Sequence, residues 1–369
     1  MKVGGAHLTY CTNIHAGESW DEVRANLERY VVRVKARVAA KDHFGVGLRL
    51  SARAARELSS PREMSALRRW LDREGLYVFT INAFPYGAFH GTRVKEDVYR
   101  PDWLEDDRVA YTELCADLLA TLLPAGVTGS VSTVPVCFHA RACDDWREQA
   151  AGRIAHAARH LEQLEARTGR RVVLALEPEP RCVVETIAQA VALFEGPLAH
   201  VSREHVGVCL DACHAAVEFE DARAAVDALR GKGIAIAKAQ LSCGLRIAPV
   251  DDAAREALAP FAEGVYLHQV VTREGRRYDD LPDALADRAA PADEWRVHFH
   301  VPIFRDALGP FTGTQAWLAE LLAIQRADAF TPHLEVETYT WDVLPAEFRG
   351  EPVEDAIARE LEWVLERLR

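Results

Sequence analysis

Carboxylate and imidazole side chains follow several apolar runs of this 369-residue chain. The residues concerned are Glu177, Glu179, Asp211, His214, His298, His300, Glu335 and Glu337. Few basic residues stand near these run ends, chiefly Lys238 and Arg246. Because an isolated buried charge is costly, the carboxylates need partners, and a divalent cation bound by oxygen and nitrogen atoms would supply one. The alternative is a ring of ion pairs and hydrogen bonds.

The elements that must position these side chains alternate along the chain. Short β-branched or apolar runs are followed by amphipathic stretches of helical length, and Ser19 with Glu22 forms a capping box before the first of these. The runs are 3–11, 44–50, 76–84, 129–136, 171–180, 205–214, 234–242 and 333–341. Such alternation predicts parallel strands joined by right-handed crossovers. Eight units, with neither glycine-rich nucleotide motif, favour an α/β fold of the (β/α)8 TIM-barrel type.

In such a barrel, catalytic groups come from the C-terminal ends of the strands and the loops that follow them. Two long connections are expected there. The segment 84–103 is predicted to cover the substrate. An insertion at about 244–296 is predicted to contain a β-hairpin that turns at 273–277. No linker divides the chain, so 1–369 is predicted to form one domain.

Charge and cysteine usage exclude several classes of function. The net charge of −12 disfavours binding to nucleic acid or to an anionic membrane. No apolar run is long enough to span a bilayer, and the first residues lack the apolar core of a signal peptide. The eight cysteines form no Cys-x-x-Cys pair, which argues against a zinc ribbon. We therefore expect a cytoplasmic protein; a homo-oligomer is one option for its assembly.

Four motifs resemble one known family. The sequences ALEPEP, CLDACH, KAQLS and LEVETYTW are similar to those of the xylose-isomerase-like barrels, the sugar phosphate isomerase/epimerase superfamily. Within it, NAFPYGAFHG, VKEDVYRPDW and HFHVPIF resemble the barrel protein of the ebo metabolite-traffic cluster. The resemblance covers essentially the whole chain and implies the barrel fold more firmly than it implies a reaction.

The resemblance also implies a set of metal ligands. Glu177, Asp211 and Glu337 match the family's acidic ligands on strands five, six and eight. The ligand expected on strand seven is open between Gln240, which stands in KAQLS, and His300, whose spacing to Glu337 suits one βα unit; we favour Gln240. One divalent ion is expected, with Mn, Mg, Zn and Co all compatible.

From this resemblance we expect a metal-dependent isomerase or epimerase acting on a sugar, sugar phosphate or cyclitol-like polyol. Glu177 and Glu337 would exchange the proton beside a carbonyl through a metal-stabilised enediolate. The predicted substrate-binding residues are Asn13, Asn82, Tyr86, His90, Glu179, His214, His298 and His300. Two alternatives remain: a metal-dependent phosphodiesterase or hydrolase of the same superfamily, disfavoured by the small number of histidines, and a non-catalytic metabolite carrier.

Overall fold

Eight parallel strands form the centre of the molecule. A computed structural model describes residues 1–91 and 93–369; Thr92, within the predicted lid, lies outside the described residues. The strands are β2 (Ala6–Tyr10), β3 (Phe44–Arg49), β4 (Leu76–Asn82), β5 (Gly129–Thr133), β6 (Val172–Leu176), β7 (Val206–Asp211), β8 (Ile236–Leu241) and β15 (His333–Val336). Each pairs in parallel with the next, and β15 pairs with β2. A parallel bridge between Cys11 and Gly47 joins β2 to β3, so the sheet closes on itself. The predicted TIM barrel is confirmed.

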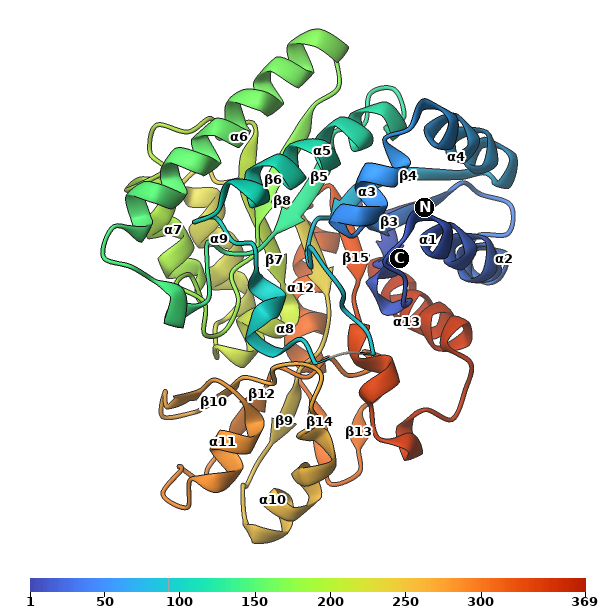
Figure 1. The fold of residues 1–369 in the computed structure, drawn as a ribbon. Coiled ribbons are helices and arrows are strands. Elements are labelled where there is room, and N and C mark those ends of the chain that lie inside the picture. The colour runs from blue at the N-terminus through green and yellow to red at the C-terminus, as the bar shows by residue number, and fades with distance from the viewer. Residues whose placement is uncertain (92) are drawn as a thin grey trace.

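Helices follow the strands and surround them (Figure 1). They are α1 (Trp20–Asn26), α2 (Val32–Val38), α3 (Ala52–Leu58), α4 (Pro61–Glu74), α5 (Asp106–Leu122), α6 (Trp146–Thr168), α7 (Ile187–Glu195), α8 (Ala212–Val217), α9 (Ala222–Gly231), α12 (Gln315–Ala327) and α13 (Val353–Leu368). The capping box before α1 forms as the sequence predicts: the Ser19 hydroxyl accepts from the Glu22 N–H, and the Glu22 carboxylate accepts from the Ser19 N–H. A single π-helical turn, Leu27–Val31, connects α1 to α2.

The inside of the barrel is polar. Thr80 and Ser130 form a hydrogen bond of 2.8 Å between their hydroxyls, and Ser130 also bonds to His333 Nδ1. Lys238 and Glu335 form a fully buried ion pair of 2.5 Å. Because successive side chains of a strand point to opposite faces, this polar inner set leaves the intervening apolar residues of each strand to pack under the helices.

A second sheet lies beyond one end of the barrel, drawn yellow to orange in Figure 1. Its strands are β9 (Leu245–Ile247), β10 (Val270–Thr272), β11 (Arg277–Tyr278), β12 (Trp295–Val297), β13 (Ala307–Leu308) and β14 (Phe311–Gly313), flanked by α10 (Asp252–Leu258) and α11 (Leu281–Ala286). All its pairings are antiparallel. The hairpin β10–β11 turns where the sequence predicts it. The sheet continues to residue 313, past the end expected near 296, because β14 returns to pair with β9.

The connection 84–103 is tied to this insertion. Lys95 Nζ donates to the Tyr266 carbonyl and to Asp280, both at 2.6 Å. At the other end of the connection, the Arg49 guanidinium donates to the Pro85 and Gly87 carbonyls. The loop after β4 and the insertion after β8 therefore form one roof over the same end of the barrel.

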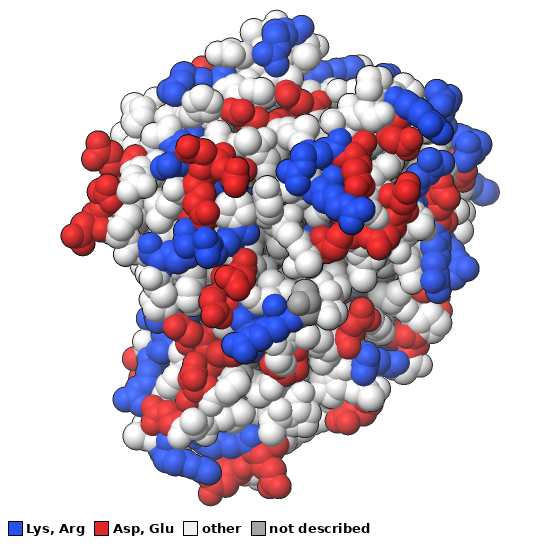
Figure 2. Space-filling model, viewed as in Figure 1, with Lys and Arg blue, Asp and Glu red and all other residues white. Residues whose placement is uncertain are grey.

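The surface carries mixed charges. On the face drawn in Figure 2, acidic and basic side chains alternate, and the described residues there form no continuous basic area. No large apolar side chain of the described residues is exposed. None of the described helices combines the length and apolar character needed to cross a bilayer.

Candidate active site

Three carboxylates converge where the barrel strands end. Asp211 is the last residue of β7, while Glu177 and Glu337 directly follow β6 and β15. One carboxylate oxygen from each lies within 4.8 Å of the others, and all three side chains are buried. Parallel strands bring their C-terminal ends to one edge, which is why residues 160 positions apart can meet here.

Burial and mutual repulsion disturb the acidity of this cluster. Burial, and then the neighbouring Asp211 and Glu335, raise the pKa of Glu337 to about 8. Burial and the charge of Glu337 raise the pKa of Glu177 well above its usual value. Asn13 and Asn82 donate to Glu337 Oε1 at 2.7 and 3.2 Å, which favours its charged form. A cation bound among these oxygens would displace the protons that the cluster otherwise retains.

The cluster fits a metal ion better than a ring of ion pairs. None of the described lysines or arginines pairs with Glu177, Asp211 or Glu337, because Lys238 is engaged by Glu335. Asp211 Oδ1 accepts from the His214 N–H and the Ser242 hydroxyl, whereas Asp211 Oδ2 is buried with no partner. Since buried polar atoms are nearly always bonded, this orphaned oxygen marks a place for a ligand.

Gln240 lies on β8, paired in register with Asp211. Lys238, two residues earlier on β8, points into the barrel, so the side chain of Gln240 points inward as well. Both polar atoms of the Gln240 amide are buried and unpartnered. The amide oxygen is therefore free to complete the carboxylate set.

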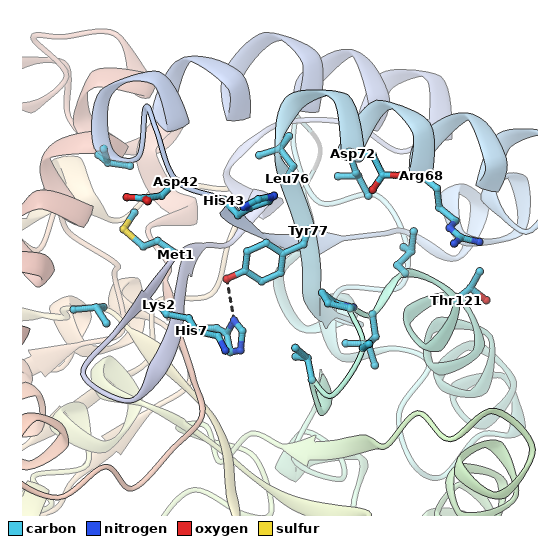
Figure 3. Close-up of a pocket in the computed structure, with 18 of the residues that line it drawn as sticks. Met1, Lys2, His7, Asp42, His43, Arg68, Asp72, Leu76, Tyr77 and Thr121 are labelled. Atoms are coloured by element: carbon cyan, nitrogen blue, oxygen red, sulfur yellow. Dashed lines mark hydrogen bonds between the residues drawn. The ribbon is translucent and has the colours of Figure 1, made fainter.

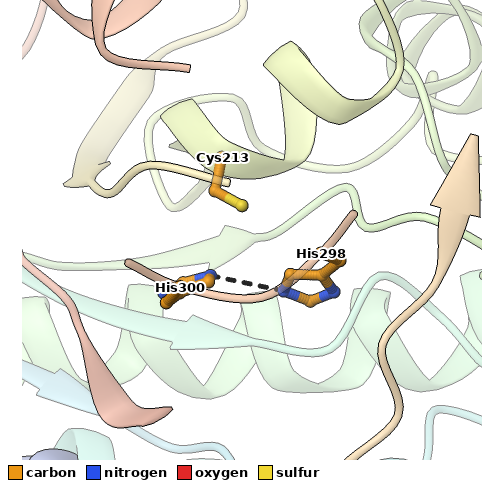
Figure 4. Close-up of side chains that lie close together, drawn as sticks. All are labelled: Cys213, His298 and His300. Atoms are coloured by element: carbon orange, nitrogen blue, oxygen red, sulfur yellow. Dashed lines mark hydrogen bonds between the residues drawn. The ribbon is translucent and has the colours of Figure 1, made fainter. Parts of the chain in front are cut away.

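Three histidines lie beside the carboxylates. His214 belongs to the first turn of α8, whose N-cap is Asp211, and His298 and His300 follow β12. The Nε2 atoms of His214 and His298 are 3.1 Å apart, and those of His298 and His300 are 3.3 Å apart. Burial lowers the pKa of His214 to about 3 and that of His300 to about 4, so both rings are neutral. Figure 4 shows Cys213 of α8 beside His298 and His300.

A cavity of ≈ 40 Å³ adjoins Glu177, Glu337 and the three histidines. Its polar lining consists of Asn13, Lys95, Glu177, Glu179, His214, His298, His300 and Glu337. Aromatic side chains of the roof complete it: Phe84, Phe89 and Tyr99 from the loop after β4, Tyr266 from the insertion, and Tyr339 from the turn after β15. This volume has room for only a few water molecules, so a sugar-sized ligand requires the roof to open.

Comparison with known proteins agrees with this architecture. The model of the xylose isomerase-like TIM barrel family matches residues 44–366. The chain belongs to this family. Among curated proteins, no sequence matches this barrel.

Solved structures of the same fold are distant in sequence. The protein IolI with a bound zinc atom is 12% identical, with a TM-score of 0.54 over 98% of this chain and 99% of its own. A xylose isomerase-like barrel protein from Mycobacterium smegmatis in complex with magnesium is 13% identical (TM-score 0.52, 100% and 98% covered). A D-tagatose 3-epimerase-like protein is 11% identical (TM-score 0.51, 98% and 100% covered). At these identities the likeness concerns the fold.

Not all the predicted substrate residues of this xylose isomerase-like barrel line the cavity. Asn82 lies beside it through its bond to Glu337. Tyr86 does not line it; its ring packs edge-on against Tyr111. The His90 ring packs edge-on against Phe89 and does not line the cavity, and both of its ring nitrogens are buried and unpartnered. The path of the loop presents Phe89 to the cavity in place of Tyr86 and His90.

A hydrogen-bonded chain that the sequence does not predict supports the roof. Tyr99 donates its hydroxyl to Glu179 at 2.6 Å, and Gln269 Nε2 donates to the Tyr99 oxygen at 2.8 Å. Burial raises the pKa of Glu179 to about 8, although the Tyr99 bond opposes this. Tyr99 and Gln269 stand in the motifs VKEDVYRPDW and YLHQV, but nothing in their spacing indicates that they meet.

A wider cavity lies at the other end of the barrel. It has ≈ 840 Å³ and is lined by Met1, Lys2, Asp42, Arg68 and Tyr77 among others. In Figure 3 the Tyr77 hydroxyl is hydrogen-bonded to His7 Nδ1, at the N-terminal ends of the strands. Because chemistry in such barrels takes place at the opposite end, this cavity is not the candidate active site.

Proposed function

We propose that the protein is a metal-dependent isomerase or epimerase of an unphosphorylated sugar or cyclitol-like polyol. The observation that carries the proposal is the pair Glu177 and Glu337: two buried carboxylates from different strands that line one cavity and share a third acid, Asp211. Exchange of a proton beside a carbonyl needs a base and an acid near the same carbon, both with pKa values close to neutral.

The ligands of the ion would be Glu177, Asp211 and Glu337, with the free amide oxygen of Gln240 as the fourth. This oxygen-rich set suits Mn²⁺ or Mg²⁺. A cation bound there would polarise a substrate carbonyl and offset the negative charge that forms when the proton leaves.

The other side chains of the cavity have separate roles in positioning Glu337 and binding the substrate. Asn13 and Asn82 fix one oxygen of Glu337, which leaves its second oxygen for the proton or the ion. Glu179 and the imidazoles supply hydrogen-bonding atoms for hydroxyl groups. The rings of Phe89 and Tyr266 offer apolar surface for the carbon face of a polyol.

Two basic groups near the roof are already paired with carboxylates, which favours an unphosphorylated substrate. Lys95 is engaged by Asp280 at 2.6 Å, and Arg246 is bound in two places by Glu294. Neither is free for a phosphate, which would need strong charge-assisted donors.

A second candidate is a metal-dependent hydrolase. The number of histidines in the sequence disfavours it, but the structure brings three imidazoles together beside Asp211. Imidazole-rich sites are typical of zinc hydrolases. Hydrogen exchange with solvent separates the two candidates: an isomerase exchanges carbon-bound hydrogen with solvent, and a hydrolase does not.

The proposal predicts proton exchange from solvent. The protein, stripped of metal and reloaded with Mn²⁺, is incubated in D2O with ketoses, aldoses and keto-cyclitols, and incorporation of deuterium is followed by mass spectrometry and NMR. We expect deuterium at one carbon beside a carbonyl of at least one compound, and no incorporation with Asp211→Ala, which loses a shared ligand. Absence of exchange across the panel, with metal bound, would contradict the proposal.

The roof segments 84–91 and 93–103 are predicted to open for substrate. Their contacts with Asp280 and Tyr266 close a cavity too small for a sugar, so the free protein must open before binding. In hydrogen exchange, saturation with a compound that shows deuterium incorporation should slow exchange in these segments, while α6 on the outside of the barrel serves as the unchanged reference. Equal exchange with and without ligand would remove the lid assignment.

A further inference from the structure

The helix α13 carries a buried acid that none of the described basic residues neutralises. Glu360 is 2% exposed, and the neighbouring Arg359 pairs with Glu351 instead. Burial raises the pKa of Glu360 to about 7. An unpaired buried carboxyl group costs stability that an apolar side chain of similar size would not cost. The contacts that Glu360 makes must therefore explain its presence.

One oxygen of Glu360 connects two segments at the active-site end of the barrel. Glu360 Oε1 accepts from the Thr338 hydroxyl at 2.7 Å and from the Ile303 N–H at 3.1 Å. Thr338 directly follows Glu337, and Ile303 stands three residues after His300. A single side chain of α13 thus fixes the chain beside a carboxylate of the cluster and the chain that follows one of its histidines.

The same two segments are also bonded to each other. His300 Nδ1 lies 2.9 Å from the Glu337 carbonyl, and because a carbonyl oxygen only accepts, the ring nitrogen is the donor. The Thr340 hydroxyl donates to the His300 carbonyl. The segments 298–303 and 337–340 therefore form one hydrogen-bonded unit, which Glu360 ties to the last helix of the barrel.

We propose that Glu360 is a positioning residue for the carboxylate cluster. Asn13 and Asn82 fix the carboxylate oxygen of Glu337, whereas Glu360 acts through Thr338 and fixes the main chain from which that side chain starts. Glu360 itself does not line the cavity. The inference rests on the carboxylate metal site of the proposed function and adds to it a residue of α13.

This role needs an acceptor oxygen at position 360 and no charge. A carboxylate, a neutral carboxylic acid and an amide each offer such an oxygen, whereas leucine offers none. Glu360→Gln should therefore keep both bonds. Glu360→Leu removes the acceptor and leaves the Thr338 hydroxyl and the Ile303 N–H without it, so the two segments lose their tie to α13.

The affinity of the full-length protein for Mn²⁺ tests the inference. The protein is stripped with a chelator and titrated with Mn²⁺, and the free ion is followed by its electron paramagnetic resonance signal. Loss of a group that holds a metal ligand in place typically weakens binding by ~10–100-fold. We expect a loss of about tenfold, at the lower end of that range, in Glu360→Leu, and an affinity close to wild type in Glu360→Gln. Equal affinity in the wild type and Glu360→Leu would overturn the proposal.

Substitutions at Thr338 test the path of the effect. Thr338→Val removes the hydroxyl and should weaken Mn²⁺ binding, whereas Thr338→Ser keeps the hydroxyl and should not. The double variant with Glu360→Leu should bind Mn²⁺ no more weakly than Glu360→Leu alone, because both changes break the same bond. Additive losses would contradict action through Thr338. Glu220→Leu, which removes an acid bonded to the Ile187 N–H away from the cavity, is the matched control and should retain wild-type affinity.

Thermal unfolding separates positioning from a purely structural role. If Glu360→Leu unfolds at a lower temperature yet binds Mn²⁺ as the wild type does, Glu360 only stabilises the fold and the proposal is refuted. If Glu360→Leu fails to fold, Thr338→Val decides the question, since it leaves α13 unchanged: wild-type Mn²⁺ affinity in that variant would refute the proposal.

The result is separable from that of the proposed function. If the wild type exchanges deuterium and Glu360→Leu binds Mn²⁺ as tightly as the wild type, the positioning role is wrong and the isomerase proposal stands. If Mn²⁺ affinity falls in Glu360→Leu and is kept in Glu360→Gln, but no polyol exchanges deuterium, the positioning role stands and the isomerase proposal fails. A wild type that binds no Mn²⁺ would contradict the carboxylate site and this inference with it.

Discussion

Turnover should fall by ~10²–10⁴-fold in Glu337→Gln and in Glu177→Gln, the loss expected when a general acid or base is removed. Glutamine keeps the size of the side chain and one coordinating oxygen, but it cannot carry a proton at neutral pH. Asn13 can still donate to the amide oxygen at position 337, so the side chain keeps its position. The measurement is the rate of deuterium exchange and of product formation, each normalised to the metal content of the same sample.

The control for these variants is another glutamate with a raised pKa. Burial raises the pKa of Glu220 to about 7, but this side chain accepts from the Ile187 N–H and does not line the active-site cavity. Glu220→Gln should therefore retain turnover. Near-wild-type rates in both cluster variants at full metal occupancy would exclude proton transfer by these two carboxylates and would favour the hydrolase or the carrier.

The barrel and its acidic end could be predicted because both depend on local patterns. Each strand–helix unit is visible in the alternation of apolar runs and amphipathic stretches. Once the strands are parallel, residues at their C-terminal ends must share one edge, so Glu177, Asp211 and Glu337 are placed together without knowledge of side-chain positions.

The roof could not be predicted in the same way, since it depends on contacts between distant segments. Lys95 bonds to Asp280, 185 residues away, and this contact decides which side of the loop faces inward. The residue types of Tyr86 and His90 predict contact with the substrate, but Phe89 is the residue of this loop that faces the cavity in their place. Strands β13 and β14, with two and three residues, are too short to show an alternating pattern.

The histidine cluster depends both on a local sequence position and on contacts between distant segments. His214 follows from the strand-end position of Asp211, three residues earlier in the chain. His298 and His300 are placed beside it by the fold of the insertion, which has no periodic signal of its own. The small number of histidines in the sequence therefore does not reveal that three imidazoles meet at the site.

The largest effect on stability is expected inside the barrel, at Lys238 and Glu335. Both side chains have no exposed surface, and their charged atoms are 2.5 Å apart. Lys238 Nζ also donates to the Ser132 hydroxyl at 3.2 Å. Burial alone would lower the pKa of Lys238, but the charge of Glu335 outweighs it and raises that pKa, so the lysine stays charged. Glu335 is tightly enclosed: a Cβ at Gly47 would lie 1.8 Å from its Oε1.

Lys238→Met should lower the free energy of unfolding by about 3–5 kcal/mol, because it leaves Glu335 buried without its cation. Replacing both partners, as Lys238→Met with Glu335→Leu, should recover most of this loss, since no unpaired charge remains.

The matched control is Arg230→Met, which breaks an exposed pair with Asp328 of 2.6 Å and should cost less than about 1 kcal/mol. Urea unfolding of the chelator-treated proteins, followed by circular dichroism, measures all three. A Lys238→Met variant as stable as the Arg230→Met control, or a double variant less stable than Lys238→Met alone, would show that the buried pair does not hold the barrel interior together.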